Sequence, residues 1–149
     1  MKRSSAVVLL FAVPFVAWMS SGSESGGVLP LHASQVAIGK LDTRTNREGP
    51  VTVTVTPKEI SPQAETWDFE VTLETHSASL DQDLTRVAVL IDASGTARPP
   101  LGWEGDPPGG HHRKGVLRFS RSAEETEFVE LRLSGVGGVP RRAFRWRLR

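Results

Sequence analysis

Apolar residues recur at every second position in six short stretches of the chain. Because side chains alternate between the two faces of a strand, each stretch covers one face with hydrocarbon and leaves the other face polar. The pattern predicts an all-β protein, a single Ig-like antiparallel β-sandwich of about seven strands. The six series are Val51-Val53-Val55, Trp67-Phe69-Val71-Leu73, Val87-Val89-Ile91, Leu117-Phe119, Val129-Leu131-Leu133 and Phe144-Trp146-Leu148.

Turn-forming residues set the expected ends of these strands. Pro57 follows the first strand and is expected to end it, because proline cannot donate to a ladder. A shorter leading strand is expected at Val36 to Leu41. Prolines and glycines are so dense from Arg98 to Gly110 that a long loop without regular structure is expected there. The expected core strands are 51–56, 66–75, 86–91, 114–120, 127–134 and 143–148.

The first residues have the layout of a signal peptide. Lys2 and Arg3 precede an apolar run from Ala6 to Met19, and small polar residues follow it. The run is about 14 residues, shorter than the roughly 20 that span a membrane as a helix. We therefore expect an exported protein, periplasmic or secreted, with no stable membrane span unless the signal stays uncleaved. The cleavage point falls between Ser20 and Ala33, where no Ala-x-Ala triplet singles out one position.

Composition fits one folded domain behind that segment. The expected organisation is a signal peptide over 1–22, a flexible tether with the leading strand over 23–49, and the β-sandwich over 50–149. The chain has no cysteine, so the core must supply the stability without disulfides. Removal of Lys2 and Arg3 leaves 16 basic against 17 acidic residues, and this balance predicts no nucleic-acid partner.

Sequence signatures of catalysis are missing. There is no thiol nucleophile, no Gly-x-Ser-x-Gly elbow, no phosphate-binding glycine loop and no His-Glu-x-x-His helix. The sequence therefore predicts a protein that is not an enzyme and that needs no cofactor.

Two neighbouring histidines, His111 and His112, offer the one alternative that involves a metal. They follow Gly109 and Gly110, whose freedom would let both imidazoles turn toward one Cu or Zn ion. His76 follows the second strong strand and would supply the third ligand, with an oxygen from Asp81, Asp83 or Glu104. In the competing interpretation, which the sequence favours, these histidines only bond backbone groups in tight loops.

The proline- and glycine-rich stretch also carries the residues expected to contact a partner. Trp103 either offers an exposed indole to a ligand or folds back over the open end of the sandwich. The leading hypothesis is an exported, non-catalytic domain that binds an unknown protein or cell-surface ligand through its loop end. The expected contact residues are Trp103, Glu104, His111, His112 and Arg113.

Arginines alternate with apolar residues at the end of the chain. Arg145, Arg147 and Arg149 therefore share the outer face of the last strand, and Arg141 and Arg142 precede them. Such a row can contact a polyanion or an acidic partner. It more often protects a sheet edge against aggregation and pairs with acidic residues on the next strand, here Glu130.

The stretch from Val51 to the C-terminus resembles exported bacterial proteins of uncharacterised function that carry a small Ig-like β-sandwich. The residues behind the resemblance are Trp67-Asp68-Phe69-Glu70-Val71, Thr75-His76-Ser77, Trp103-Glu104-Gly105, Gly110-His111-His112 and Gly115-Val116-Leu117-Arg118-Phe119. The resemblance implies the fold and export, and it carries no activity and no functional residues.

Overall fold

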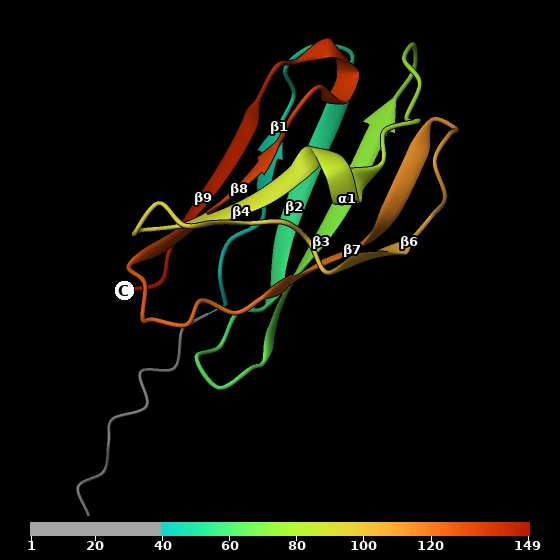
Figure 1. The fold of residues 1–149 in the computed structure, drawn as a ribbon. Coiled ribbons are helices and arrows are strands. Elements are labelled where there is room, and N and C mark those ends of the chain that lie inside the picture. The colour runs from blue at the N-terminus through green and yellow to red at the C-terminus, as the bar shows by residue number, and fades with distance from the viewer. Residues whose placement is uncertain (1–39) are drawn as a thin grey trace, which may run out of the picture. The chain divides into compact units, whose positions relative to one another are not determined.

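Two antiparallel sheets lie face to face in the computed structural model, which describes residues 40–149 (Figure 1). The five-stranded sheet has the order β1 (Arg44–Asn46), β2 (Val51–Glu59), β3 (Thr66–Thr75), β7 (His112–Ser120) and β6 (Gly102–Gly105). The four-stranded sheet has the order β5 (Ala97–Arg98), β4 (Ala88–Asp92), β8 (Phe128–Leu133) and β9 (Arg142–Arg147). A one-turn helix, α1 (Leu84–Val87), and a 3-10 turn at Val136–Gly138 complete the described elements. The fold is an all-β sandwich, as the alternation predicts.

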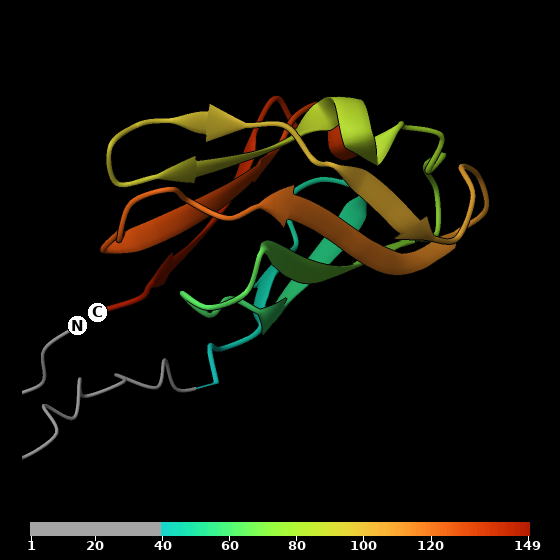
Figure 2. The ribbon, with the colours of Figure 1, turned by 60° about the horizontal axis from the view of Figure 1, so that its bottom comes forward.

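The chain passes from one sheet to the other three times. It crosses from β3 through α1 to β4, from β5 to β6, and from β7 to β8. Figure 2 shows the two layers with these connections at their ends. Each sheet therefore combines strands that are not consecutive in the sequence.

The apolar series of the sequence form the core between the sheets. Phe69, at the centre of β3, is fully buried, and its ring centroid lies 5.8 Å from that of Phe119 and 5.5 Å from that of Trp146. The indole Nε1 of Trp67 donates to the Ser61 carbonyl at 3.1 Å, which satisfies its polar atom inside the core. Burial of each such aromatic side chain stabilises the fold by about 2 to 3 kcal/mol.

Several strand limits differ from the sequence prediction. β2 continues through Pro57, which is buried, and the register shifts between Pro57 and Glu59. A bulge accommodates the missing amide there, so the proline does not end the strand. The first residues of the expected strand 86–91 belong to α1, and β4 begins at Ala88.

Short strands also occupy segments predicted as loops. β5 and β6 lie in or beside the stretch Arg98 to Gly110, which was predicted to lack regular structure. β1 pairs with β2 ahead of residue 50, where the sandwich was predicted to begin. Of the predicted leading strand, 36–39 lie outside the described residues, and Lys40 and Leu41 have no regular structure.

Candidate functional site

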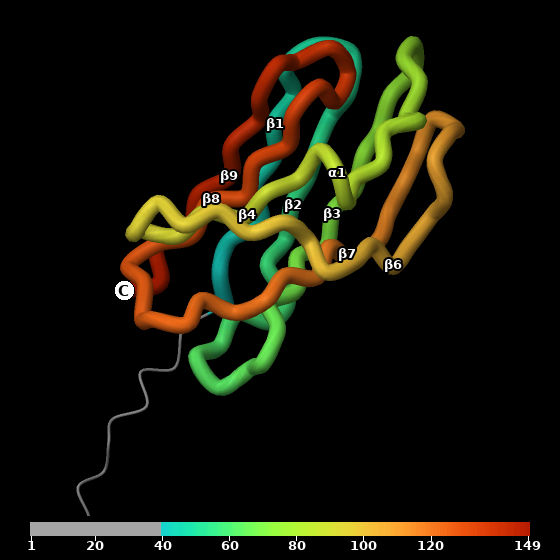
Figure 3. The backbone as a smooth tube through the Cα atoms, in the orientation of Figure 1, coloured from blue at the N-terminus to red at the C-terminus, as the bar shows by residue number. Residues whose placement is uncertain are grey.

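Of the predicted contact residues, His111, His112 and Arg113 lie where β3 ends, whereas Trp103 and Glu104 lie on the β6 edge of the same sheet. In the β3–β7 register Glu74 lies opposite His112, and the Thr75 amide donates to the His111 carbonyl at 2.9 Å. The connection after β3 and the β6–β7 hairpin consequently run side by side, as the tube in Figure 3 shows. We call this region, residues 76–84 and 101–113, the loop end.

Arg113 is the centre of the loop end, and it is only 1 % exposed. Its Nη1 donates to the carbonyls of Leu80 and Gln82, both at 2.8 Å, and its Nη2 donates to the Asp106 carbonyl at 3.3 Å. One side chain thus joins the two loops, and the Gly109 amide adds a bond to the Leu80 carbonyl at 3.1 Å. The sequence predicts a contact residue at this position, whereas the structure buries Arg113.

The charge of Arg113 is held without an ion pair among the described residues. Burial lowers the pKa of its guanidinium, although the nearby carboxylates of Asp106, Asp81 and Asp83 act in the opposite direction. Within residues 40–149 its Nε has no hydrogen-bond partner, nor has the buried Oε1 of Gln82. The carbonyl cage and the three aspartates together keep a cation in a buried position.

Trp103 folds back toward the core rather than out to solvent. It packs against the core cluster, its Nε1 donates to the Asp106 carbonyl at 2.9 Å, and the Arg113 guanidinium lies 5.6 Å from its ring centroid. Gly115 makes this position available, since a Cβ built there would lie 2.6 Å from Trp103 Cζ2. Of the two arrangements predicted for Trp103, the structure has the one in which it covers the sandwich.

A shallow pocket of about 250 Å³ lies beside Trp103 on the β6 edge. It is lined by Leu101, Gly102, Trp103, Glu104, Val116 and Arg118. Leu101 is 62 % exposed, and within residues 40–149 it is the single exposed large apolar side chain. An apolar side chain at the mouth of a pocket is a typical anchor point for a partner. The sequence hypothesis places the contact surface chiefly at Leu101 to Arg113 and near His76, so the stretch includes Leu101, but this side chain is not among the named contact residues.

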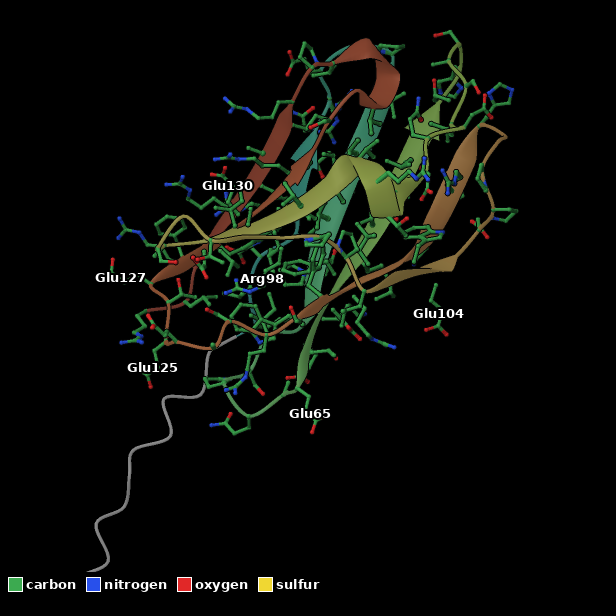
Figure 4. All side chains as sticks on the ribbon, viewed as in Figure 1. Glu65, Arg98, Glu104, Glu125, Glu127 and Glu130 are labelled. Carbon is green, nitrogen blue, oxygen red and sulfur yellow. The ribbon has the colours of Figure 1, made fainter. Side chains whose placement is uncertain are left out.

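Opposite charges border this pocket. Glu104 is exposed on β6, and Figure 4 shows it on the opposite side of the domain from Glu125, Glu127 and Glu130. Arg118 forms a bidentate pair with Asp68, in which its Nε and Nη2 donate at 2.9 Å each. The guanidinium is therefore fixed in direction while remaining accessible.

The predicted metal ligands lie at the loop end without forming a ligand set. His76, His111 and His112 are all exposed, and His112 Nδ1 is 3.5 Å from Glu74 Oε1 on the outer face. Asp83 caps α1, since its Oδ1 accepts the Thr85 amide at 3.0 Å. Over residues 40–149 no group of three or more histidines and acidic residues has the geometry to hold a metal ion.

Two further buried polar groups, Arg142 and Asp92, lie outside the loop end. The sequence predicts Arg142 as part of the arginine row on the outer face of the last strand, but the structure turns it inward and buries it. Arg142, 1 % exposed, donates to the carbonyls of Val136, Asn46 and Glu48 and to Asn46 Oδ1. These bonds tie β9 to the β1–β2 connection. Burial lowers its pKa, with the charge of Glu48 acting in the opposite direction.

Asp92 closes the end of β4 and is 4 % exposed. Burial raises the pKa of this carboxyl, but hydrogen bonds from Ser94, Arg98, Thr96 and Ser122 outweigh that effect and lower the pKa to about 2. Its Oδ2 pairs with Arg98 Nη1 at 2.8 Å. All its partners belong to the same turn or to neighbouring chain segments, so this carboxylate is a structural group.

Comparisons with known proteins leave the site to be interpreted from its own geometry. No family model matches the sequence, and searches of the curated proteins and of the solved structures found no similar protein. In the described part of the chain, no helix has the length and apolarity that crossing a membrane requires.

Proposed function

We propose that the chain is an exported, non-catalytic β-sandwich domain of the Ig-like type that binds a partner polypeptide at the loop end. The pocket on the β6 edge, with Leu101 exposed beside it, carries this proposal. The layout of the first residues supports export, and the arrangement of two antiparallel sheets supports the Ig-like type.

The chemistry of the pocket fits an apolar side chain next to charged groups. Leu101, Val116 and the edge of Trp103 supply apolar contact, whereas Glu104 and Arg118 supply one charge of each sign at the rim. This combination of an apolar centre and a polar rim is common at protein interfaces. The partner is therefore expected to present an aliphatic or aromatic residue flanked by polar residues.

Backbone groups on the β6 edge add a second means of contact. The Asp106 amide donates to the Lys114 carbonyl at 2.9 Å, so the bonded pairs of this antiparallel ladder are 106 with 114 and 104 with 116. The amides and carbonyls of Trp103 and Gly105 point away from β7, toward the free edge. An extended segment of the partner can pair with them.

Arg113 contributes rigidity to this surface. By joining the connection after β3 to the β6–β7 hairpin, it holds the loops in place before any partner arrives. A pre-organised surface loses less conformational entropy on binding, so even a small contact area can give useful affinity.

A peptide-display selection on the immobilised full chain tests the proposal. Selected peptides are then compared on the wild type, on Leu101→Asp and on Ala123→Asp, an exposed control position that receives the same charge. We expect Leu101→Asp to weaken binding at least tenfold and Ala123→Asp to leave it unchanged. Peptides that bind Leu101→Asp as well as the wild type would place the binding surface elsewhere and refute the proposal.

A further inference from the structure

Five arginines gather on the outer side of β8 and β9, far from the loop end. Arg141, Arg145, Arg147 and Arg149 have the same strand parity, and all four are exposed. Arg132 lies on the same face, since it pairs with Ala143 across the ladder. Alternate residues of a strand are about 7 Å apart, so these guanidinium groups form a row at regular intervals.

A buried carboxylate holds part of this row in place. Glu130, 6 % exposed, accepts from Arg132 Nε and, at 2.8 Å, from Arg145 Nε. The Arg145 guanidinium also lies 4.2 Å from the Phe128 ring centroid. Both arginines are thereby fixed, yet their side chains keep 32 % and 56 % of their surface exposed.

Acidic residues neutralise only part of the charge. Glu130 serves two arginines, and Glu125 pairs with Arg149 at 2.6 Å. Arg141 and Arg147 form no ion pair among the described residues. Residues 40–149 contain equal numbers of basic and acidic residues, 16 of each, so the positive charge here is a local excess. Figure 4 shows Glu125, Glu127 and Glu130 on this side of the domain and Glu104 on the other, so the five arginines outnumber the acidic residues labelled there.

We infer that this arginine row binds a linear polyanion that carries phosphate or sulfate groups, such as an anionic glycan. Guanidinium groups recognise phosphate and sulfate oxygens through paired N–H donors, and a row at regular intervals fits repeated charges along a polymer. The inference is independent of the pocket at the loop end.

The same face argues against two other anionic partners. Its aromatic ring, Phe128, is covered by Arg145, whereas single-stranded nucleic acids are usually held by base stacking on open aromatic rings. Among residues 40–149 the exposed large apolar side chain is Leu101, on the opposite edge, so this face has none to insert into a bilayer.

Binding of the full chain to heparin and to long-chain polyphosphate, measured by fluorescence anisotropy at several salt concentrations, tests the inference. The test variant is R141Q/R147Q, which removes two exposed arginines outside the Glu130 pairs. The matched control is K58Q/K114Q, which removes two exposed lysines from the outer face of the other sheet. Melting temperatures of both variants check that the fold is intact.

We expect R141Q/R147Q to weaken binding about tenfold or more and to lower the salt slope by about 0.7 per arginine, with the control unchanged. Preference for heparin or for polyphosphate would identify the anionic group, and either one supports the inference. Equal losses in both variants would overturn it. So would binding confined to single-stranded DNA or to phosphatidylglycerol vesicles, or no binding to heparin and polyphosphate at low salt.

Discussion

Arg113 and Arg142 are two buried arginines in different sheets of one small sandwich, and they have different surroundings. Both are 1 % exposed, and both bond carbonyl oxygens rather than carboxylates. Arg142 uses all three of its nitrogens, including Nε, which donates to Val136. Arg113 leaves Nε without a partner in the described part of the chain, and a pocket opens next to the Trp103 ring on which its guanidinium lies.

The same kind of carbonyl cage around a buried arginine thus has different consequences at the two positions. Around Arg142 every N–H donor has a partner, and these bonds attach β9 to the β1–β2 connection. Around Arg113 the same type of cage fixes two loops but leaves the β6 edge free. Full satisfaction of a buried polar group favours stability, whereas incomplete satisfaction is more common where a surface has a function.

Arg142→Ala should have the largest effect on stability. The substitution leaves the carbonyls of Val136, Asn46 and Glu48 without their donor and opens a cavity beside them. We expect a loss of about 3 to 5 kcal/mol in the free energy of unfolding, measured by urea denaturation. A loss below about 1 kcal/mol would show that water replaces the guanidinium easily and would remove the distinction from Arg113.

Arg113→Ala should cost less, about 2 to 3 kcal/mol, because fewer hydrogen bonds are lost. Its specific effect is expected in hydrogen exchange. The amide of Gly109, bonded to Leu80, should exchange faster, while amides of β9 keep their protection. Uniform acceleration across both sheets would mean that Arg113 stabilises the whole domain rather than the loop end.

Acid should destabilise the four-stranded sheet through Asp92. Its folded pKa of about 2 lies below the ordinary value of 3.8, so its contribution is fully present above pH 5 and is lost as the pH falls toward 2. The shift corresponds to about 2 kcal/mol. Urea denaturation at pH 6 and pH 2.5 should show this loss for the wild type, and Asp92→Asn should show a smaller pH dependence.

Leu101→Ala should barely change stability, by about 0.5 kcal/mol or less, because the side chain is mostly exposed. Trp103→Ala, two residues further along the chain, should cost about 2 kcal/mol because the indole packs on the core. Thermal melts of the two variants separate a contact residue from a packing residue. Similar losses in both would show that Leu101 also belongs to the fold.

Zinc and copper should give the smallest effect of all. The three histidines are exposed, and the pairing of His112 Nδ1 with Glu74 Oε1 at 3.5 Å supplies only two of the three ligands that a metal site needs. We therefore expect addition of Zn²⁺ or Cu²⁺ to leave the melting temperature unchanged. A rise in the wild type that His111→Ala/His112→Ala abolishes would favour the metal-binding alternative. Removal of any purification tag that contains histidine is essential for this measurement.

Alternation of side chains predicted the long strands because those strands bury one face. The alternating Val and Thr residues of β2 and the aromatic series of β3 are two examples. β6 escaped prediction because Gly102 and Gly105 provide no side-chain pattern, and the strand is held by backbone bonds to β7. β1 escaped for a related reason, since its residues are mostly exposed.

The buried arginines could have been found from parity. Arg113 is in phase with Leu117 and Phe119, and Arg142 is in phase with Phe144 and Trp146, so each points inward with its apolar neighbours. A charged residue in an inward position indicates a long-range partner, but the carbonyls that bind it depend on loop paths that no local pattern specifies. For the same reason the sequence does not single out Leu101 within the stretch that it predicts to contact a partner.

Gly105 and Gly115 face each other across the β6–β7 ladder, and a Cβ added at either would lie 2.4 to 2.6 Å from backbone atoms of the other strand. Gly115 lines no part of the pocket, yet its missing methyl group allows the indole of Trp103 to rest against the backbone. The residue at position 115 thus governs the shape of the pocket beside Leu101 without lining it. Evolution or protein engineering could widen or close the pocket by replacing Gly115 with a residue that carries a Cβ, while every lining residue stays the same.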